Sequence, residues 1–514
     1  MEEKFKGLSP AEFFLRFKET AGLSNPAKIV YITIRELVEN SLDSCEKYRI
    51  LPVIKLEITE FPDNIIKISC SDNGAGVPDK EIPKSFGQLF YSSKYTMCQH
   101  RGLFGMGGKL VMLYGQVETG KPTTIISMPL KDTKTYGYNI KIDVKTNSPI
   151  VLKKIESPKS TNNHGLKIIT YTKGNLTEGL KLIQKYLEET SIINPYANIS
   201  LKVNSLIKKK NDVNLFFNNY TNKMPEPPKE TKPHPQTITF ADFSELVKNS
   251  KETTILEFLK NNFQTVGENE AVRFLKYCRL SKNLEIKKLA DTELFSLYNS
   301  LIKFNFKSAS SKSLGLITEE IFKQTIIKKY SPTFIAYSKR SGSYEGFPFA
   351  VETVAIYREK PFIINDDEKS VLEVSIHRYA NRMPLITDSH DLIYHVINNT
   401  NYSKYNLEIN KIKFFVHICS TKIPFKSQGK ESIADVEEIS DKLRLCVLDC
   451  TRKLSANVKK TKIIAAKKSK YEFMVKFLTK ISDIVSKSLN KPKIPVEEII
   501  KKEVSLNEIA KKST

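Results

Sequence analysis

The sequence lacks the features that would place a chain in a membrane or direct it through a secretory pathway. It has no uncharged apolar run of about 18 residues or more, the length that a membrane-spanning helix requires. Its N-terminus, MEEKFKGLSP, is acidic and mixed rather than basic and then apolar, so we expect no signal peptide. The seven cysteines are odd in number and form no CxxC pair, which argues against a disulfide framework and a zinc site. We therefore expect a reducing, cytoplasmic setting and no membrane partner.

The chain also has too few acidic side chains to balance its basic ones. The chain has 81 Lys and Arg against 57 Asp and Glu, a net charge of +24. Residues 451–514 carry 17 basic and 6 acidic side chains, a surplus of +11 in about an eighth of the length. Such a surplus favours a polyanionic partner, with double-stranded DNA as the first choice. A charged tail can also simply be solvated, so the tail indicates proximity to DNA and no more.

The spacing of apolar residues predicts an α+β fold. The first 228 residues mix helix-like and strand-like segments that are adjacent in sequence, as in an α+β sandwich rather than a doubly wound parallel sheet. The segment NKMPEPPKETKPHP (222–235) has five prolines in fourteen residues and marks a linker. Three stretches follow. Residues 229–306 are predicted to be short helices from about 238 onward. In 307–470 strands return and a long helix is expected to begin near Glu431, and 471–514 is the basic tail.

One predicted helix carries an unusual polar stripe within RELVENSLDS (35–44). At about 100° per residue, Asn40 and Asp43 fall within roughly 40° of Glu36, on opposite sides of it. The residues predicted to face a core are Val30, Ile34, Leu37, Val38 and Cys45. By itself such a stripe is more often a solvated face than a site.

Two glycine-rich segments follow. In SDNGAGVP (71–78), Asp72 ends an apolar strand and Gly76 belongs to a turn that needs positive φ or close backbone approach. A carboxylate there could accept a hydrogen bond from an adenine amino group, although DNG is usually only a turn.

The second segment, RGLFGMGGKL (101–110), has neither the Walker A nor the dinucleotide-binding spacing. Its closely spaced glycines and the helix start that follows could nevertheless offer backbone N–H groups to phosphate, with Lys109 adding charge. A flexible loop is the alternative. The candidate phosphate-binding residues are Gly102, Leu103, Phe104, Gly105, Met106, Gly107, Gly108 and Lys109.

Taken in order, the helix stripe, SDNGAG, FGQLFYSSK and GLFGMGGK resemble the motifs of the GHKL ATPases, the superfamily of DNA gyrase, MutL, heat-shock chaperones and sensor histidine kinases. The resemblance implies a Bergerat-type ATP-binding sandwich with the stripe Glu36, Asn40 and Asp43 as the floor of the ATP site. Glu36 would be the general base that activates water, Asn40 would hold Mg²⁺, and Asp72 would bind adenine. The loop 102–109 would close over the phosphates as a lid.

Further segments resemble a narrower group, the B subunits of topoisomerase VI, archaeal-type type IIB topoisomerases: SPAEFF, NPAK, YTNKMPEPP, KPHP, RYANRMPL and CSTKIPFKSQGKESIADVEEI. This resemblance implies that Ser93 and Lys94 contact nucleotide and that Lys430, in GKES, reaches the γ-phosphate as a catalytic residue. It also implies an ATP-binding domain with an N-terminal dimerisation segment (1–228), a helix-two-turns-helix domain (229–306), a transducer (307–470) and a basic helical tail (471–514).

The same resemblance implies the partners and the activity. Two B and two A subunits would form a heterotetramer in which ATP dimerises the B subunits and drives one DNA duplex through a double-strand break made by the A subunits. A MutL-like repair ATPase and a non-hydrolysing DNA-binding clamp are the alternatives.

Two positions depart from the family pattern. Leu166, in HGLKI, stands where a threonine usually lies near the adenine, and Gln88 stands where relatives often have a basic residue. The loss of the threonine hydroxyl puts nucleotide affinity and base selectivity in question. Neither change affects the stripe.

Overall fold

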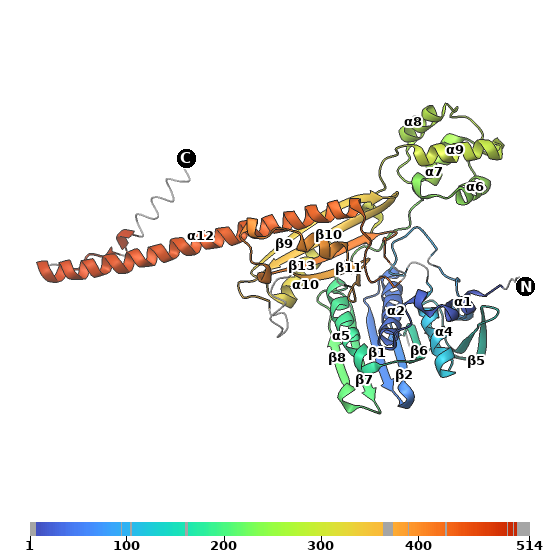
Figure 1. Cartoon of the computed structure of the whole chain (residues 1–514), viewed down its shortest axis with the longest axis horizontal. Helices are drawn as coiled ribbons and strands as arrows, with labels where there is room; N and C mark the ends of the chain where they lie inside the picture. The colour runs from blue at the N-terminus through green and yellow to red at the C-terminus, as the bar shows by residue number, and fades with distance from the viewer. Residues whose placement is uncertain are drawn as a thin grey trace, which may run out of the picture.

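The computed structural model describes residues 7–93, 95–102, 105–159, 163–362, 374–388, 390–426, 429–490, 492–496 and 498–500. Figure 1 shows two sheets with their helices, a small helical unit beside them and one long helix that projects from the second sheet. The predicted α+β class is confirmed. Within the described residues, no helix combines the length and apolar character needed to cross a membrane. All seven cysteines are free.

The first sheet has the strand order β5-β4-β3-β6-β2-β1-β7-β8, and neighbours pair antiparallel except for β1 and β7. Its strands are β1 (Val53–Glu60), β2 (Ile65–Asp72), β3 (Thr123–Met128), β4 (Lys134–Asp143), β5 (Ser148–Pro158), β6 (Gly165–Lys173), β7 (Asn198–Ser205) and β8 (Val213–Phe217). The helices of this part are α1 (Pro10–Arg16), α2 (Pro26–Lys47), α3 (Ile82–Gly87), α4 (Gly107–Thr119) and α5 (Leu176–Ile193).

Two local features explain why the first sheet and its helices form. Apolar and polar residues alternate along the strands, and side chains cap the helix starts. In β1, Ile54, Leu56 and Ile58 point to one face and pack in the same core as α2, α4 and α5, while the residues between them are exposed. Helix α2 begins at Pro26, and the Asn25 side chain accepts hydrogen bonds from the first free backbone N–H groups. The core face of α2 is the one that the sequence predicts.

The helical unit contains α6 (Phe240–Asn249), α7 (Ile255–Asn262), α8 (Glu268–Cys278) and α9 (Asp291–Lys303). Phe243, Phe258 and Phe274 are fully buried at its centre. Threonines at 239 and 254 cap the first two helices with their hydroxyl groups. The predicted stretch of short helices is therefore confirmed.

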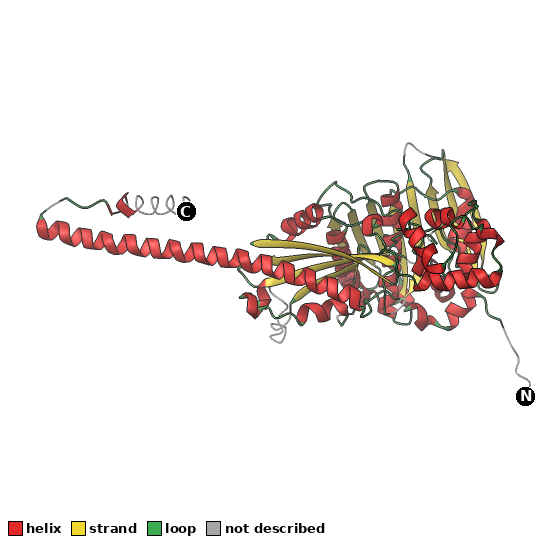
Figure 2. Ribbon diagram, turned by 90° about the horizontal axis from the view of Figure 1, so that it is seen from above, coloured by secondary structure: helices red, strands yellow, loops and turns green. Residues whose placement is uncertain are grey.

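The second sheet has the order β12-β11-β13-β10-β9. Its elements are α10 (Glu319–Tyr330), β9 (Phe334–Tyr344), β10 (Phe347–Tyr357), β11 (Ser375–Ala380), β12 (Met383–Pro384), α11 (Leu392–Asn398), β13 (Ile412–Ser420) and α12 (Glu437–Leu489). The first turns of α12 pack on this sheet through Ile439, Leu443 and Val447, and the rest projects beyond it (Figure 2).

The long helix begins at Glu437, not near Glu431 as the sequence suggests. The backbone of residues 432–434 is used in pairing with residues 424–426: Lys426 donates to the Ser432 carbonyl and Ala434 to the Pro424 carbonyl. Because these groups are already bonded in an extended arrangement, they are not available for a helical turn.

Candidate nucleotide-binding site

The polar stripe of α2 lies where the sequence predicts it. Glu36 is 7% exposed, Asp43 is partly buried and Asn40 is exposed. The Glu36 carboxylate accepts a hydrogen bond from Arg35 Nη2 at 3.1 Å. Val30, Ile34, Leu37, Val38 and Cys45 are all buried on the other side of the helix.

The first turn of α4 lies directly against this stripe. A methyl group at Gly107 would overlap the Glu36 carboxylate, and one at Gly108 would lie 3.2 Å from Asn40 Nδ2. Any other residue at position 107 would therefore push the Glu36 carboxylate out of its present place. The helix has no acidic residue in its first turn and no side-chain cap. Its N-terminal N–H groups and positive dipole end thus favour an anion beside Glu36 and Asn40.

The glycine-rich segment before α4 is only partly described. Gly105 has a φ of +60°, and a Cβ there would collide with the Ser92 hydroxyl group. Lys109 is buried and donates a hydrogen bond to the Tyr91 carbonyl, which ties the start of α4 to the loop that carries the exposed Ser93. Of the other predicted residues, Met106 directly precedes α4 and Gly102 directly follows Arg101. Lys94, Leu103 and Phe104 lie outside the described residues.

Asp72 ends β2 and is 8% exposed. Its Oδ2 accepts a hydrogen bond from Ser41 at 2.8 Å, and its Oδ1 accepts from the backbone N–H groups of Gly74 at 2.8 Å and Leu166 at 3.3 Å. Burial raises the pKa of this carboxyl, and the hydrogen bonds oppose that rise. Gly76, with a φ of +66°, turns the chain away behind it.

The departure at Leu166 falls directly opposite Asp72. Leu166 pairs with Asp72 between β6 and β2, so its backbone still contacts the carboxylate. Its apolar side chain provides no hydroxyl group there. Ser41, on α2, already donates a hydrogen bond to one oxygen of Asp72. Sequence reasoning missed this contact, although Ser41 lies within RELVENSLDS.

Arg101 connects the base of the glycine-rich segment to α2 and to the second sheet. Its side chain is 2% exposed and contacts Asp43 at 2.6 Å and Glu46 at 2.5 Å. Glu46 also contacts Arg382, which follows β11, at 2.8 Å. Burial would raise the pKa of Glu46, yet the two guanidinium groups hold it below its ordinary value. Asp43 is therefore engaged with Arg101, and sequence reasoning missed this network of residues far apart in the chain.

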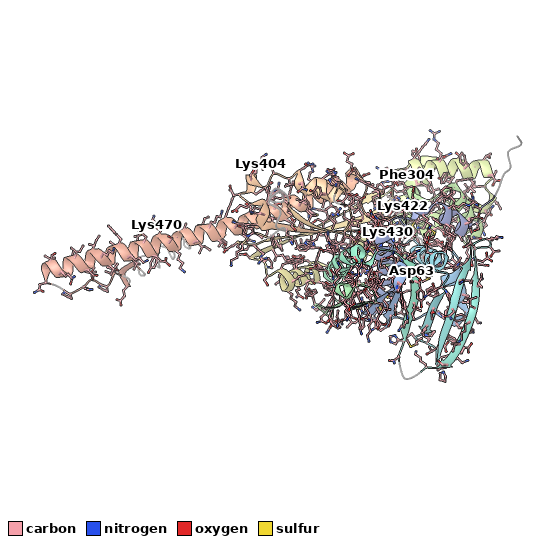
Figure 3. All side chains as sticks on the ribbon, turned by 60° about the horizontal axis from the view of Figure 1, so that its bottom comes forward. Asp63, Phe304, Lys404, Lys422, Lys430 and Lys470 are labelled. Carbon is pink, nitrogen blue, oxygen red and sulfur yellow. The ribbon has the colours of Figure 1, made fainter. Side chains whose placement is uncertain are left out.

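Lys430 comes to the stripe from the second sheet's side, 394 positions after Glu36. Its ammonium donates to the Arg101 carbonyl at 3.2 Å and lies 3.8 Å from Glu39 Oε2 and 4.0 Å from Glu36 Oε1. Figure 3 places Lys430 where the two sheets meet. Because α12 starts at Glu437, Lys430 does not lie at a helix N-terminus, where the positive end of the helix dipole would disfavour its charge.

Neighbours on both sides anchor the Lys430 segment to α2. The Gly429 carbonyl accepts a hydrogen bond from Arg35 Nη1 at 3.0 Å. Glu431 pairs with Lys28 at 2.9 Å. Farther along the same interface, Glu189 of α5 accepts hydrogen bonds from His377 at 2.8 Å and Tyr379 at 2.6 Å. Burial would raise the pKa of Glu189, but His377 and Tyr379 hold it at about 2.

A second group with metal-binding side chains lies in the second sheet. Glu352, His417 and Cys419 are fully buried and close together. Glu352 accepts hydrogen bonds from His417 and from two backbone N–H groups, and His417 Nε2 accepts from the Arg382 backbone. These groups satisfy one another, so the cluster is a hydrogen-bonded part of the core.

Comparisons with known proteins agree with this arrangement. Residues 30–185 match the family model described as histidine kinase-, DNA gyrase B- and HSP90-like ATPase. The sheet, its helices and the site of the first part thus define a GHKL ATPase. Residues 309–470 match the family model of the topoisomerase VI B subunit transducer.

Long relatives extend the similarity over nearly the whole chain. The B subunit of type 2 DNA topoisomerase 6 from Saccharolobus shibatae is 36% identical over 490 residues, covering 94% of this chain and 90% of that one. The corresponding B subunit from Sulfurisphaera tokodaii is 37% identical over 491 residues, covering 93% and 90%. The chain therefore belongs to the topoisomerase VI B-subunit family, the ATPase subunits of ATP-dependent type IIB DNA topoisomerases.

A solved structure of the ATPase region of Saccharomyces cerevisiae topoisomerase II covers 90% of this chain and 98% of its own. Its sequence identity is 12% and its TM-score 0.41, too distant to add to the argument.

Proposed function

We propose that this chain is the ATP-operated clamp of a type IIB topoisomerase. ATP binding would dimerise two copies around DNA, and the cycle would drive one duplex through a double-strand break made by a partner A subunit in a complex of two A and two B subunits. The observation that carries the proposal is the approach of Lys430, from the transducer side, to within 4.0 Å of Glu36 on α2. A nucleotide beside Glu36 would thus contact both parts of the chain.

The positions of the described site residues support the roles that the resemblance implies for the site. Glu36 is the general base, because its carboxylate lies against the N-terminus of α4, where the phosphates would be stabilised. Asp72 and Gly76 hold the adenine end, Asp43 supports the floor, and Ser93 and Lys94 contact the nucleotide. The lid that covers the phosphates consists of Gly102, Leu103, Phe104, Gly105, Met106, Gly107, Gly108 and Lys109.

The residues present fit Mg²⁺. Asn40 is exposed on the same face as Glu36, beside the anion-favouring start of α4. An amide oxygen suits this hard cation, which keeps several waters and binds phosphate oxygens. Asn40 would hold the ion, and the ion would supply positive charge to the phosphates.

Lys430 would couple nucleotide state to the transducer. An ammonium at this position can bond the γ-phosphate of ATP and finds no equivalent group in ADP. A ligand shifts a conformational equilibrium only through such a differential contact. Lys430 is therefore both a catalytic residue and the link between the two parts.

The division of the chain into functional parts supports the same proposal. The N-terminal dimerisation segment would include α1 and its C-cap, where Phe13 and Phe17 are 42% and 49% exposed and their tilted rings lie 5.0 Å apart. Residues 229–306 would be the helix-two-turns-helix domain and 307–470 the transducer. The basic tail 471–514 begins inside α12, so the helix carries the transducer continuously into it.

The test is strand passage by the chain together with a candidate A subunit. We expect ATP-dependent relaxation of supercoiled DNA by the complex and none by either subunit alone. Glu36→Ala should keep ATP binding and lower hydrolysis by ~10²–10⁴-fold, the usual loss for a removed general base. Glu57→Ala, at an exposed position of β1, is the control that should leave both unchanged. Normal hydrolysis by Glu36→Ala would contradict the assignment.

A further inference from the structure

Glu39 is a buried carboxylate to which the sequence pattern assigned no role. It lies on α2 beside Asn40 and is 3% exposed. Neither of its oxygens accepts a hydrogen bond within the described residues. Buried carboxylates are normally hydrogen-bonded, because removing the charge from water is costly without compensation. The absence of such bonds at Glu39 therefore requires a physical reason.

The compensation at Glu39 is electrostatic and comes partly from across the interface. Arg35 Nε lies 3.6 Å from Glu39 Oε1, and Lys430 Nζ lies 3.8 Å from Glu39 Oε2. Arg35 is also engaged with Glu36 at 3.1 Å and with the Gly429 carbonyl at 3.0 Å. Two carboxylates, of Glu36 and Glu39, thus lie beside two cations. One cation, Arg35, belongs to α2, and the other, Lys430, comes from the second part of the chain.

The Lys430 ammonium is held loosely enough to move. Its hydrogen bond goes to the Arg101 carbonyl at 3.2 Å, and both nearby carboxylates are beyond hydrogen-bond distance. Lys430 has a φ of +56°, and the neighbours Gly429 and Glu431 are anchored to α2 by contacts that do not involve its side chain. The ammonium can therefore change partners while the segment that carries it stays in place.

We propose that Glu39 is a positioning residue that holds Lys430 in the nucleotide-free state and competes with the γ-phosphate for it. The inference rests on the proposed contact between Lys430 and the γ-phosphate. When Lys430 turns to the phosphate, Glu39 loses its nearest ammonium. This loss opposes triphosphate binding and does not act on a diphosphate, which has no γ-phosphate. Glu39 thus weakens triphosphate binding. It also draws Lys430 back to its nucleotide-free position once the γ-phosphate has left.

The decisive measurement is the ratio of the dissociation constants for ADP and for a non-hydrolysable triphosphate, adenylyl imidodiphosphate, in the full-length chain. Glu39→Gln keeps the shape of the side chain and removes its charge. We expect the preference for the triphosphate to rise about tenfold, within the 5–150-fold span of typical couplings between sites. The affinity for ADP should stay within about twofold. In a Lys430→Met background the same change should leave the ratio unaltered.

Glu431→Gln is the matched control. It removes a carboxylate from the same segment and breaks a contact with α2, but it leaves Glu39 in place. We expect it to leave the ratio unchanged, so an increase equal to that of Glu39→Gln would mean that loosening of the segment is responsible and would overturn the proposal. An unchanged or lower ratio in Glu39→Gln would also overturn it, as would an increase that persists in Lys430→Met.

The failure of the proposed function gives a different result. If Lys430→Met alone leaves the ratio unchanged, Lys430 does not contact the γ-phosphate, and the premise is wrong rather than the role of Glu39. If Glu39→Gln does not fold, Glu39→Asp replaces it, because this change keeps the charge but withdraws it from Lys430. An unchanged ratio in Glu39→Asp would then overturn the proposal.

Discussion

Replacing Glu46 by glutamine would remove the carboxylate that Arg101 and Arg382 share. The side chains of these three residues are 7%, 2% and 4% exposed, so solvent screens the pairs weakly. Arg101 would keep Asp43 and the Asn194 side chain, both at 2.6 Å. Arg382 would keep the Tyr196 hydroxyl at 3.1 Å and no carboxylate within salt-bridge distance among the described residues. The change therefore leaves a buried guanidinium group without a carboxylate partner.

Breaking a buried pair by removing one partner costs about 3–5 kcal/mol of unfolding free energy. In parts of about 150–250 residues, each kcal/mol lowers the melting temperature by about 2–4 °C. We therefore expect Glu46→Gln to lower the first melting transition by about 10 °C in calorimetry. The exposed variant Glu57→Gln should change it by less than about 2 °C. A decrease for Glu46→Gln as small as that of the control would refute the reasoning.

The dependence on pH provides an independent check on the same pair. The pKa of Glu46 in the folded chain is below its ordinary value of 4.5. A carboxyl whose pKa is depressed by folding contributes stability that is fully present above the unfolded pKa and is lost as pH falls through the folded one. The difference in melting temperature between wild type and Glu46→Gln should therefore be constant above about pH 5.5 and shrink below 4.5. A difference that grows toward acid would contradict the assigned charge.

Three further predictions concern the site and the DNA. Gly107→Ala would place a methyl group on the Glu36 carboxylate and should lower ATP hydrolysis about tenfold or more. Gly267→Ala is the control, because Gly267 has open space around it, and it should leave hydrolysis unchanged. Equal rates for the two variants would contradict the packing of α4 against α2. Asn40→Ala should raise the Mg²⁺ concentration needed for ATP binding and lower turnover, and normal Mg²⁺-dependent binding would exclude the metal role. Affinity for duplex DNA should fall about tenfold or more between 50 and 200 mM salt, because the net charge of +24 acts through counterion release. The affinity should depend little on the DNA sequence. A flat salt dependence would count against the clamp.

The parts of the fold that depend on local pattern could be predicted from the sequence. The core face of α2 and the strand that ends at Asp72 follow from helical and strand periodicity, which places each side chain without knowledge of distant contacts. Glu39 could have been found in the same way, since at about 100° per residue it lies roughly 60° from Glu36, toward the same face. It was missed because the stripe was limited to side chains within roughly 40° of Glu36, and Glu39 lies just outside that angle.

Contacts between distant segments could not be predicted in this way. No local pattern indicates that Glu46 pairs with Arg382, 336 positions later, since an isolated buried charge pair leaves no periodicity in the sequence. The start of α12 was misplaced for a related reason. Residues 432–434 have no strong signal against a helix, and it is their pairing with residues 424–426 that keeps them extended.

The positions of Arg101 and Lys430 constrain how the two parts of the chain can move. The backbone of Arg101 accepts the Lys430 hydrogen bond, and its side chain reaches Arg382 through Glu46. The base of the glycine-rich segment is thus tied to the second sheet at two places. A displacement of Arg101 either carries the turn after β11 with it or separates a buried pair at a cost of about 3–5 kcal/mol. Release of Lys430 from Arg101 costs less, because it breaks one hydrogen bond from a charged donor, worth about 1.5–3 kcal/mol, and lengthens contacts with Glu39 and Glu36 that are already 3.8 and 4.0 Å. The weaker tie should therefore change with the nucleotide, while the stronger one keeps the two parts aligned.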